Sequence, residues 1–198
     1  GDTHLLELVG STYWLKNIYI KTGEIFRFRL GTGWGNTFGY THAIFDTSAA
    51  DTLTEHTNDN NFVAAENGIF TFKIEPVEAS YAINVYFNAF EDGFEVKGGF
   101  NEWGDGVAMV KIETPSETSE VVDPTAIPTD LHYRTAAMSF TANDEYKVKA
   151  MLTWEISWGS ETGGNLKATE TGSFMVDVVF TVTSTRAVTA VVTLIAAV

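Results

Sequence analysis

The chain has 198 residues, and 44% of them are hydrophobic, so a packed core can form and global disorder is excluded. The formal net charge of -14 disfavours nucleic acid and anionic lipid surfaces as partners. The absence of cysteine excludes disulfides and thiolate chemistry.

Two stretches of the sequence repeat at a constant offset of 120 residues. Residues 26–30 alternate apolar side chains with arginines, and residues 146–150 alternate apolar side chains with lysines. A turn of the form Trp-x-x-Thr/Ser-aromatic-Gly follows each of them. This pattern predicts a duplicated module. The matched turn positions are Trp34 with Trp154, Phe38 with Trp158, and Gly39 with Gly159.

The first copy is predicted to consist of strands joined by turns and one long loop. Residues 40–66 are polar and rich in turn-forming side chains, so we expect a loop with at most one short strand there. Alternating or short apolar runs bounded by Gly, Pro and Asn predict the strands. These runs are residues 5–9, 13–20, 25–30, 68–74 and 81–87.

In the second copy, residues 172–178 and 187–194 are the expected counterpart of the hairpin 68–87, here at an offset of 104. The difference of 16 residues falls in the long loop of the first copy. Residues 94–99 are expected to open the second module as residues 5–10 open the first. Residues 107–112 then form a strand without a counterpart, so the first module is predicted to lack one strand.

No segment of about ten or more residues shows helical periodicity, and short strands follow one another at close spacing. We therefore predict an all-β fold of two tandem Ig-like antiparallel β-sandwich modules. The expected modules are residues 1–90, with the long loop 40–66, and residues 91–198. No apolar run reaches the roughly 18 residues of a membrane helix, so no membrane span is expected.

The repeated pattern resembles a known family. A strand with alternating cations, a Trp-x-x-Asn-x-Gly-like turn, a loop and a Gly-x-Phe-x-Val/Ile strand are similar to the modules of SusE/SusF-type proteins, the outer-membrane starch-binding lipoproteins of Bacteroidetes. Residues 98–103, Gly-Gly-Phe-Asn-Glu-Trp, resemble that family's Gly-x-Phe-Asn-x-Trp opening. Thr37 and Ser157 stand where the family has Asn. The resemblance implies a non-catalytic protein outside the cell or on its outer surface, with Ig-like modules that hold glycans.

Glycan binding is the first functional hypothesis. Aromatic faces stack against the C–H face of a sugar ring, and nearby polar groups bond its hydroxyls. The alternative for each aromatic residue is a place in the core, which the position beside the repeat strand favours for Trp34 and Trp154. The candidate stacking residues are Trp103, Trp158, Phe38, Trp34 and Trp154.

Self-assembly is the second functional hypothesis. The last 12 residues carry no charge, and a module that lacks a strand exposes an unpaired edge. One chain's tail would complete the first module of the next chain by strand donation, which builds a filament of identical subunits. The alternative is that the tail is the last strand of its own module, and an N-terminal donor is also open. The assembly candidates are Val191, Val192, Leu194, Ile195 and Val198.

Catalytic chemistry finds no support in the sequence, so no enzyme activity is expected. No His-Glu-x-x-His and no Gly-x-Ser-x-Gly pattern is present. No cofactor is expected apart from a weakly indicated calcium ion in the long loop, because carboxylate oxygens are calcium's preferred ligands. The calcium candidates are Asp46, Asp51, Asp59 and Glu66.

Overall fold

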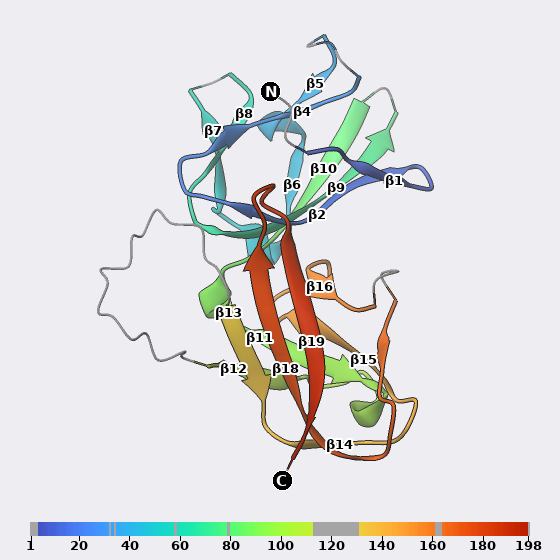
Figure 1. The fold of residues 1–198 in the computed structure, drawn as a ribbon. Helices are drawn as coiled ribbons and strands as arrows, with labels where there is room; N and C mark the ends of the chain where they lie inside the picture. The colour runs from blue at the N-terminus through green and yellow to red at the C-terminus, as the bar shows by residue number, and fades with distance from the viewer. Residues whose placement is uncertain are drawn as a thin grey trace, which may run out of the picture. The chain divides into compact units, whose positions relative to one another are not determined.

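The structure is a computed structural model that describes residues 4–31, 33, 35–57, 59–78, 80–112, 131–160 and 164–197. Almost all of its regular structure is strand, which confirms the all-β prediction (Figure 1). The chain forms two compact units. The first comprises Gly1–Phe90 with Thr185–Ala187, and the second comprises Glu91–Ser184 with Val188–Val198. The main division lies at the predicted module boundary.

Two packed layers of strands build the first unit. One layer has the order β1-β2-β9-β10-β6, and the other contains β7-β8-β3 and the pair β4-β5. The strands are β1 Glu7–Val9, β2 Thr12–Ile20, β3 Ile25–Phe26, β4 Phe28–Arg29, β5 Thr37–Phe38, β6 Ala43–Phe45, β7 Leu53–His56, β8 Asn61–Ala64, β9 Gly68–Val77 and β10 Ser80–Asn88. The short 3-10 helices η1 Tyr40–His42 and η2 Thr47–Ala49 flank β6. The predicted long loop thus holds three strands.

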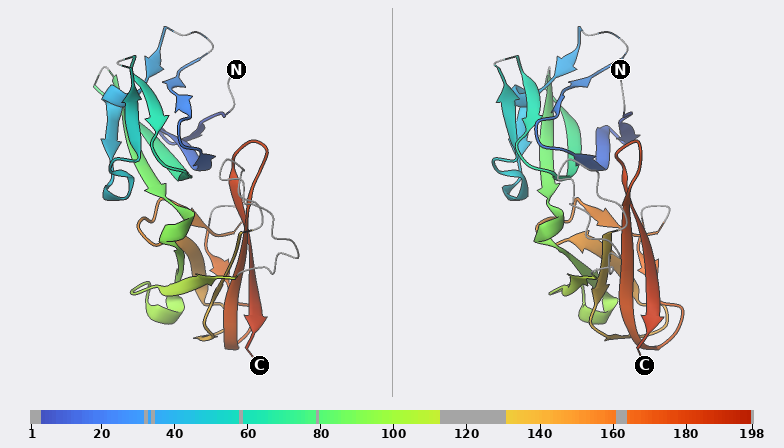
Figure 2. Two further views of the ribbon diagram at one scale, coloured as in Figure 1. Left: turned by 90° about the vertical axis from the view of Figure 1, so that its left-hand side faces the viewer. Right: turned by 60° about the vertical axis from the view of Figure 1, so that its left-hand side comes forward.

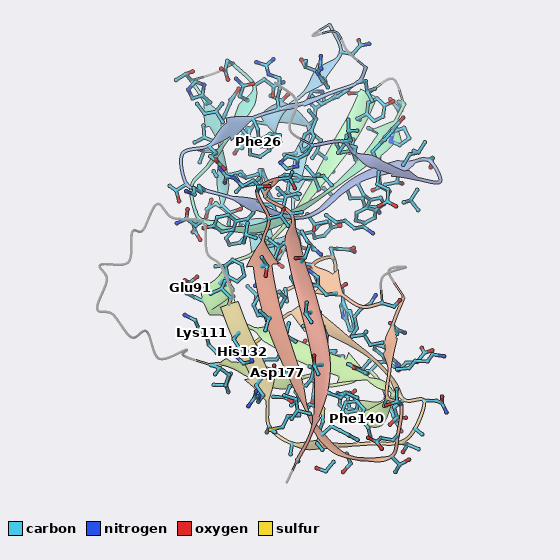
Figure 3. All side chains as sticks on the ribbon, viewed as in Figure 1. Phe26, Glu91, Lys111, His132, Phe140 and Asp177 are labelled. Atoms are coloured by element: carbon cyan, nitrogen blue, oxygen red, sulfur yellow. The ribbon has the colours of Figure 1, made fainter. Side chains whose placement is uncertain are left out.

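Aromatic side chains join the two layers of the first unit. Phe72 of β9 is fully buried, and its ring centroid lies 5.0 Å from that of Phe28 and 5.6 Å from that of Phe26. Phe26, labelled in Figure 3, also stacks on a residue of β8. The ring centroids of Phe26 and Phe62 are 5.1 Å apart. The alternation of the repeat strand therefore points its phenylalanines into the core and its arginines away from it.

The second unit contains one curled sheet of nine strands. Its main order is β14-β18-β13-β12-β11-β15-β16, with β17 on β15 and β19 on β18. The strands are β11 Phe94–Gly98, β12 Val107–Lys111, β13 Leu131–Thr135, β14 Met138–Phe140, β15 Glu145–Ala150, β16 Ser157–Trp158, β17 Leu166–Lys167, β18 Gly172–Val182 and β19 Val188–Ala196. The 3-10 helices are η3 Phe90–Asp92 and η4 Gly99–Asn101. Figure 2 shows β18 and β19 side by side as a long hairpin.

The core of the second unit is centred on Phe94 of β11. Its ring lies 4.4 Å from Phe180 of β18, 5.0 Å from Tyr133 of β13 and 5.7 Å from Trp158 of β16. All four side chains are buried. β12 pairs with both β11 and β13 and so joins the strands that contribute to this cluster into one sheet.

Apart from β10 and β19, whose equivalent positions differ by 109 residues, the matched strands of the two units pair in the same register. The offset of 120 that the sequence shows for the repeat strand reappears in the pairing of β4 with β5 and of β15 with β16. Residues of β8 correspond to residues of β17, and residues of β9 to residues of β18, at an offset of 104. The equivalent pairs are Phe28↔Phe38 with Val148↔Trp158, Phe26↔Phe62 with Tyr146↔Leu166, Tyr13↔Ile74 with Tyr133↔Val178, and Ile20↔Gly68 with Phe140↔Gly172.

Backbone contacts outside the strands repeat as well. A Cβ on Gly39 would lie 1.6 Å from the Asn60 carbonyl oxygen, and a Cβ on Gly159 would lie 1.9 Å from that of Gly164. The next amide donates to the same oxygen in each unit, at 3.1 and 2.9 Å respectively. The glycine of the repeat is therefore required by a close backbone approach in both copies. These matched details support a duplication more strongly than the sequence pattern does.

One strand equivalence differs from the expectation. We expected residues 94–99 to correspond to residues 5–10, and β12 to have no counterpart. Instead, β1 pairs with β2 as the end of β12 pairs with β13, with Leu8 opposite Tyr13 and Lys111 opposite Tyr133. The strand without a counterpart in the described part of the first unit is β11. The sequence of β1 is similar to that of β11, but β1 pairs with β2 and not with the repeat strand.

Candidate functional site

Two tryptophans of the second unit form an exposed pair. Trp103 follows η4, and Trp154 lies in the turn between β15 and β16. Their ring centroids are 6.3 Å apart with an interplanar angle of 45°. Trp103 is 36% exposed and Trp154 is 45% exposed. Two indole rings open to solvent at this separation have the size and chemistry to contact a sugar ring.

Basic side chains surround the Trp154 ring. The Nζ atoms of Lys149 and Lys97 lie 5.1 and 5.4 Å from its centroid. Lys149 is buried, and its Nζ donates to Glu95 Oε1 at 2.7 Å and to the Met151 carbonyl at 3.2 Å. Lys97 lies 3.6 Å from the same carboxylate. The ammonium groups of Lys97 and Lys149 therefore lie over the Trp154 ring. The sequence did not predict this arrangement, and the alternating cations of the repeat strand, which include Lys149, were its one local signal.

The other aromatic candidates are placed differently. Trp158 is buried, and its Nε1 donates to the Val188 carbonyl at 3.0 Å. This placement contradicts the expectation of a stacking role for Trp158, which is a core residue whose ring packs against both Phe94 and Phe180. Phe38 is half-buried against Tyr81, at 4.7 Å between ring centroids. Trp34 lies outside the described residues.

The acidic candidates do not converge on one point in the described parts of the chain, where no group of three or more His, Asp or Glu side chains is placed to hold a metal. Asp46 caps η2 by accepting from the Ser48 amide at 3.0 Å. Asp59 accepts from the amide and side chain of Asn61 and contacts His56 at 3.0 Å. The hydrogen bond with His56 is the largest cause of a lowered pKa for Asp59, and the bond from the Asn61 amide adds to it. Calcium binding by Asp46, Asp51, Asp59 and Glu66 stays a prediction.

The repeat strand of the first unit has an open edge. In the second unit, β15 pairs with β16 and β17 along one edge and with β11 along the other. In the first unit, β5 and β8 cover the equivalent of the first edge. Among the described residues, no strand pairs with the second edge, which runs along residues 26–30. We call this the open edge.

Side chains near the open edge are less buried than their counterparts under β11. Tyr13 and Phe38 are half-buried, whereas the equivalent Tyr133 and Trp158 are 3% and 8% exposed. The same difference separates two further pairs, of which the first-unit member is half-buried and the second-unit member is at most 4% exposed. These pairs are Phe26 with Tyr146 and Leu30 with Ala150. Among the described residues, the core of the first unit is therefore more exposed at the place where the second unit has β11.

The apolar tail is part of its own chain's sheet. Val191, Val192, Leu194 and Ile195 lie in β19, which pairs with β18 over nine residue pairs from Phe174↔Ala196 to Val182↔Val188. This placement contradicts the expectation that the tail is donated to a neighbouring chain, because every residue of β19 is already paired with β18 of the same chain. Val198 lies outside the described residues. In the described part of the chain, no strand pairs with the other edge of β19.

A scan against models of known protein families and a search of curated proteins both found no match. In the described parts of the chain, no helix has the length and apolar character that crossing a membrane requires.

Proposed function

We propose that this protein is a self-assembling structural subunit of an extracellular polymer. The observation that carries the proposal is the open edge, with the half-buried aromatic side chains beside it. A strand from a neighbouring chain would add to this edge as β11 adds to β15. A sheet edge that no described strand covers is a template for such pairing.

The second unit indicates what the added strand contributes. Phe94 and Val96 of β11 are fully buried. Burying side chains of this size contributes about 1.5–3 kcal/mol each, and each added backbone hydrogen bond contributes about 1 kcal/mol net. A donor strand of five residues therefore supplies several kcal/mol against the cost of association. Since donor and acceptor surfaces differ, the contact is head-to-tail and builds an open polymer unless its rotation closes a ring.

Substitutions at Arg27 test the proposal. The Leu30 amide donates to Asn36 on the covered side, so alternation directs the Arg27 amide to the open edge. Arg27→Pro removes that donor, and Arg27→Ala keeps it while removing the same side chain. We expect wild type and Arg27→Ala to form polymers in electron micrographs, and Arg27→Pro to remain a folded monomer by circular dichroism and light scattering. Monomeric wild-type protein at every concentration would contradict the proposal.

Glycan binding is the second candidate function, and the Trp103–Trp154 pair favours it. Both rings are partly open to solvent, and Trp154 is held by Lys97 and Lys149. The test is a titration with malto-oligosaccharides followed by tryptophan fluorescence. We expect Trp103→Ala and Trp154→Ala to abolish the change in emission, and Trp14→Ala, in the first unit, to keep it. An unchanged wild-type spectrum at millimolar sugar excludes this class of ligand.

A further inference from the structure

We propose that the strand which fills the open edge is the N-terminal segment of a second copy of this chain, bound through Leu6, Glu7, Leu8, Val9 and Gly10. This inference rests on the proposed function and names its partner. The segment would pair with residues 26–30 in the direction and register in which β11 pairs with β15.

The first argument is sequence similarity between the segment and β11. Residues 6–10 read Leu-Glu-Leu-Val-Gly, and β11 reads Phe-Glu-Val-Lys-Gly, at an offset of 88 residues. Both have two apolar residues on one face, a glutamate between them and a terminal glycine. Residues 6–10 thus carry the pattern of a strand that β15 already accepts, although in the structure they form β1 instead.

The second argument is the exposure of the segment in its own chain. All three residues of β1 are exposed, with Leu8 at 57% and Val9 at 50%. Leu5, just before it, is 92% exposed. Only three residue pairs hold β1 to β2. Leu6 is half-buried against the first unit's own core, whereas the short hairpin that holds residues 7–9 is marginally stable, so these three residues are available to a better partner.

The third argument is complementarity to the open edge. In the register of β11, Leu6 and Leu8 lie opposite Leu30 and Phe28 and take the buried places of Phe94 and Val96. Glu7 lies opposite Arg29, as Glu95 lies opposite Lys149, where the two charges are 2.7 Å apart. The glutamate of the segment therefore meets a cation in the same register.

The last position of β11 requires a glycine, and Gly10 supplies one at the matching position of the segment. Its counterpart Gly98 lies opposite Tyr146, and a Cβ there would lie 2.4 Å from the Glu145 carbonyl oxygen and 2.9 Å from the Tyr146 Cβ. A larger residue would meet backbone at this point. Glycine at position 10 removes the equivalent clash with Ile25 and Phe26.

Chain length favours a second copy over the same chain. Val9 pairs with Thr12 across the tight turn at Gly10 and Ser11, and β2 belongs to the layer opposite the open edge. Two residues span at most about 7 Å, whereas packed layers lie about 10 Å apart. In the second unit, β12 and a further connection separate β11 from β13. Residues 6–10 therefore reach a neighbour's open edge more readily than their own.

Engineered cysteines test the register directly, because the chain has none of its own. Glu7→Cys with Arg29→Cys places two thiols at opposed positions, within the Cα separation of a disulfide. We expect a ladder of disulfide-linked oligomers on a non-reducing gel after mild oxidation. The control, Glu7→Cys with Arg27→Cys, shifts the register by two residues and should give few cross-links. An intramolecular disulfide, or polymers without cross-links, overturns the proposed donor but leaves self-assembly in place.

Point substitutions give an independent readout without oxidation. Leu8→Asp places a charge in the buried position of Val96, while in the free chain residue 8 is exposed, so folding is retained. We expect the concentration needed for polymers to rise by more than about tenfold. Leu5→Asp, at a more exposed position outside the five-residue match, should leave it unchanged. Equal polymerisation by Leu8→Asp and wild type overturns the proposed donor, whereas absence of polymers in wild type overturns self-assembly itself.

Discussion

Single residues show how the two copies diverged while keeping their backbone positions. At one equivalent cross-strand pair, the first unit has Trp14 and Lys73, with the ammonium 5.7 Å from the indole centroid. The second unit has Arg134 and Asp177, joined at 2.6 Å, and His132 contacts the same carboxylate at 2.8 Å (Figure 3). A cation–π contact in one copy is thus replaced by an ionic cluster in the other at the same place in the sheet.

The Glu95–Lys149 pair is expected to be a strong determinant of the second unit's stability. Its side chains are 12% and 3% exposed. Glu95→Gln leaves a buried ammonium without its carboxylate, so we expect a loss of about 3 kcal/mol in the free energy of unfolding, measured by urea titration. The control is Glu145→Gln at the exposed Glu145–Lys167 pair, where we expect less than about 1 kcal/mol. Equal effects would mean that solvent reaches Lys149.

The glycine after the repeat turn gives a second prediction at the residue scale. An alanine Cβ at position 39 or 159 would overlap a carbonyl oxygen of the backbone, so the strand must move. We expect Gly39→Ala and Gly159→Ala each to lower the free energy of unfolding by about 2–3 kcal/mol in thermal denaturation. Gly35→Ala, where no atom lies within 4 Å of the added Cβ, should change it by less than about 0.5 kcal/mol. Mild effects at only one of the two equivalent sites would argue against the shared turn.

At the scale of elements, the sequence predicted the repeat strand and both hairpins because alternation and turn residues are local signals. It did not predict which strand of the second unit has no counterpart in the described part of the first unit: residues 107–112 were expected, and the strand is β11. Residues 6–10 and 94–98 have the same pattern, but the first set pairs with β2 and the second with β15. Partner choice depends on chain length and on edges already covered, and neither is a local property of five residues. The prediction that Trp158 is a stacking residue was wrong for a similar reason. Whether an aromatic residue after a turn is buried depends on distant strands that pack on it, here those of Phe94 and Phe180.

The edge strand β19 carries nine residues without a charge, and natural edge strands usually carry charges that block uncontrolled pairing. Val191 is its most exposed large apolar side chain, at 69%. We expect Val191→Lys to reduce amorphous aggregation on heating, measured by light scattering, because the charge repels a second copy of the strand. Its stability should change by less than about 0.5 kcal/mol. Unchanged aggregation would mean that another surface is responsible.

At the scale of the whole molecule, the net charge opposes the proposed assembly. Each chain carries a net charge of -14, so identical chains repel at long range. The Debye length falls from about 30 Å at 0.01 M to about 8 Å at 0.15 M ionic strength. We therefore expect the concentration needed for polymers to fall as salt is raised over this range, in sedimentation assays. A rise with salt would indicate that local ion pairs such as the proposed one between Glu7 and Arg29 of neighbouring chains outweigh the net repulsion.

The built-in β11 has a practical consequence. Because the second unit contains a strand without a counterpart in the described part of the first unit, the sequence of β11 is a pattern for a competing ligand. In the proposed polymer, a free peptide based on Phe94–Gly98 would occupy the acceptor at a growing end and offer no acceptor in return. Such a peptide is expected to behave as a chain terminator, shortening polymers in proportion to its concentration without denaturing the subunits.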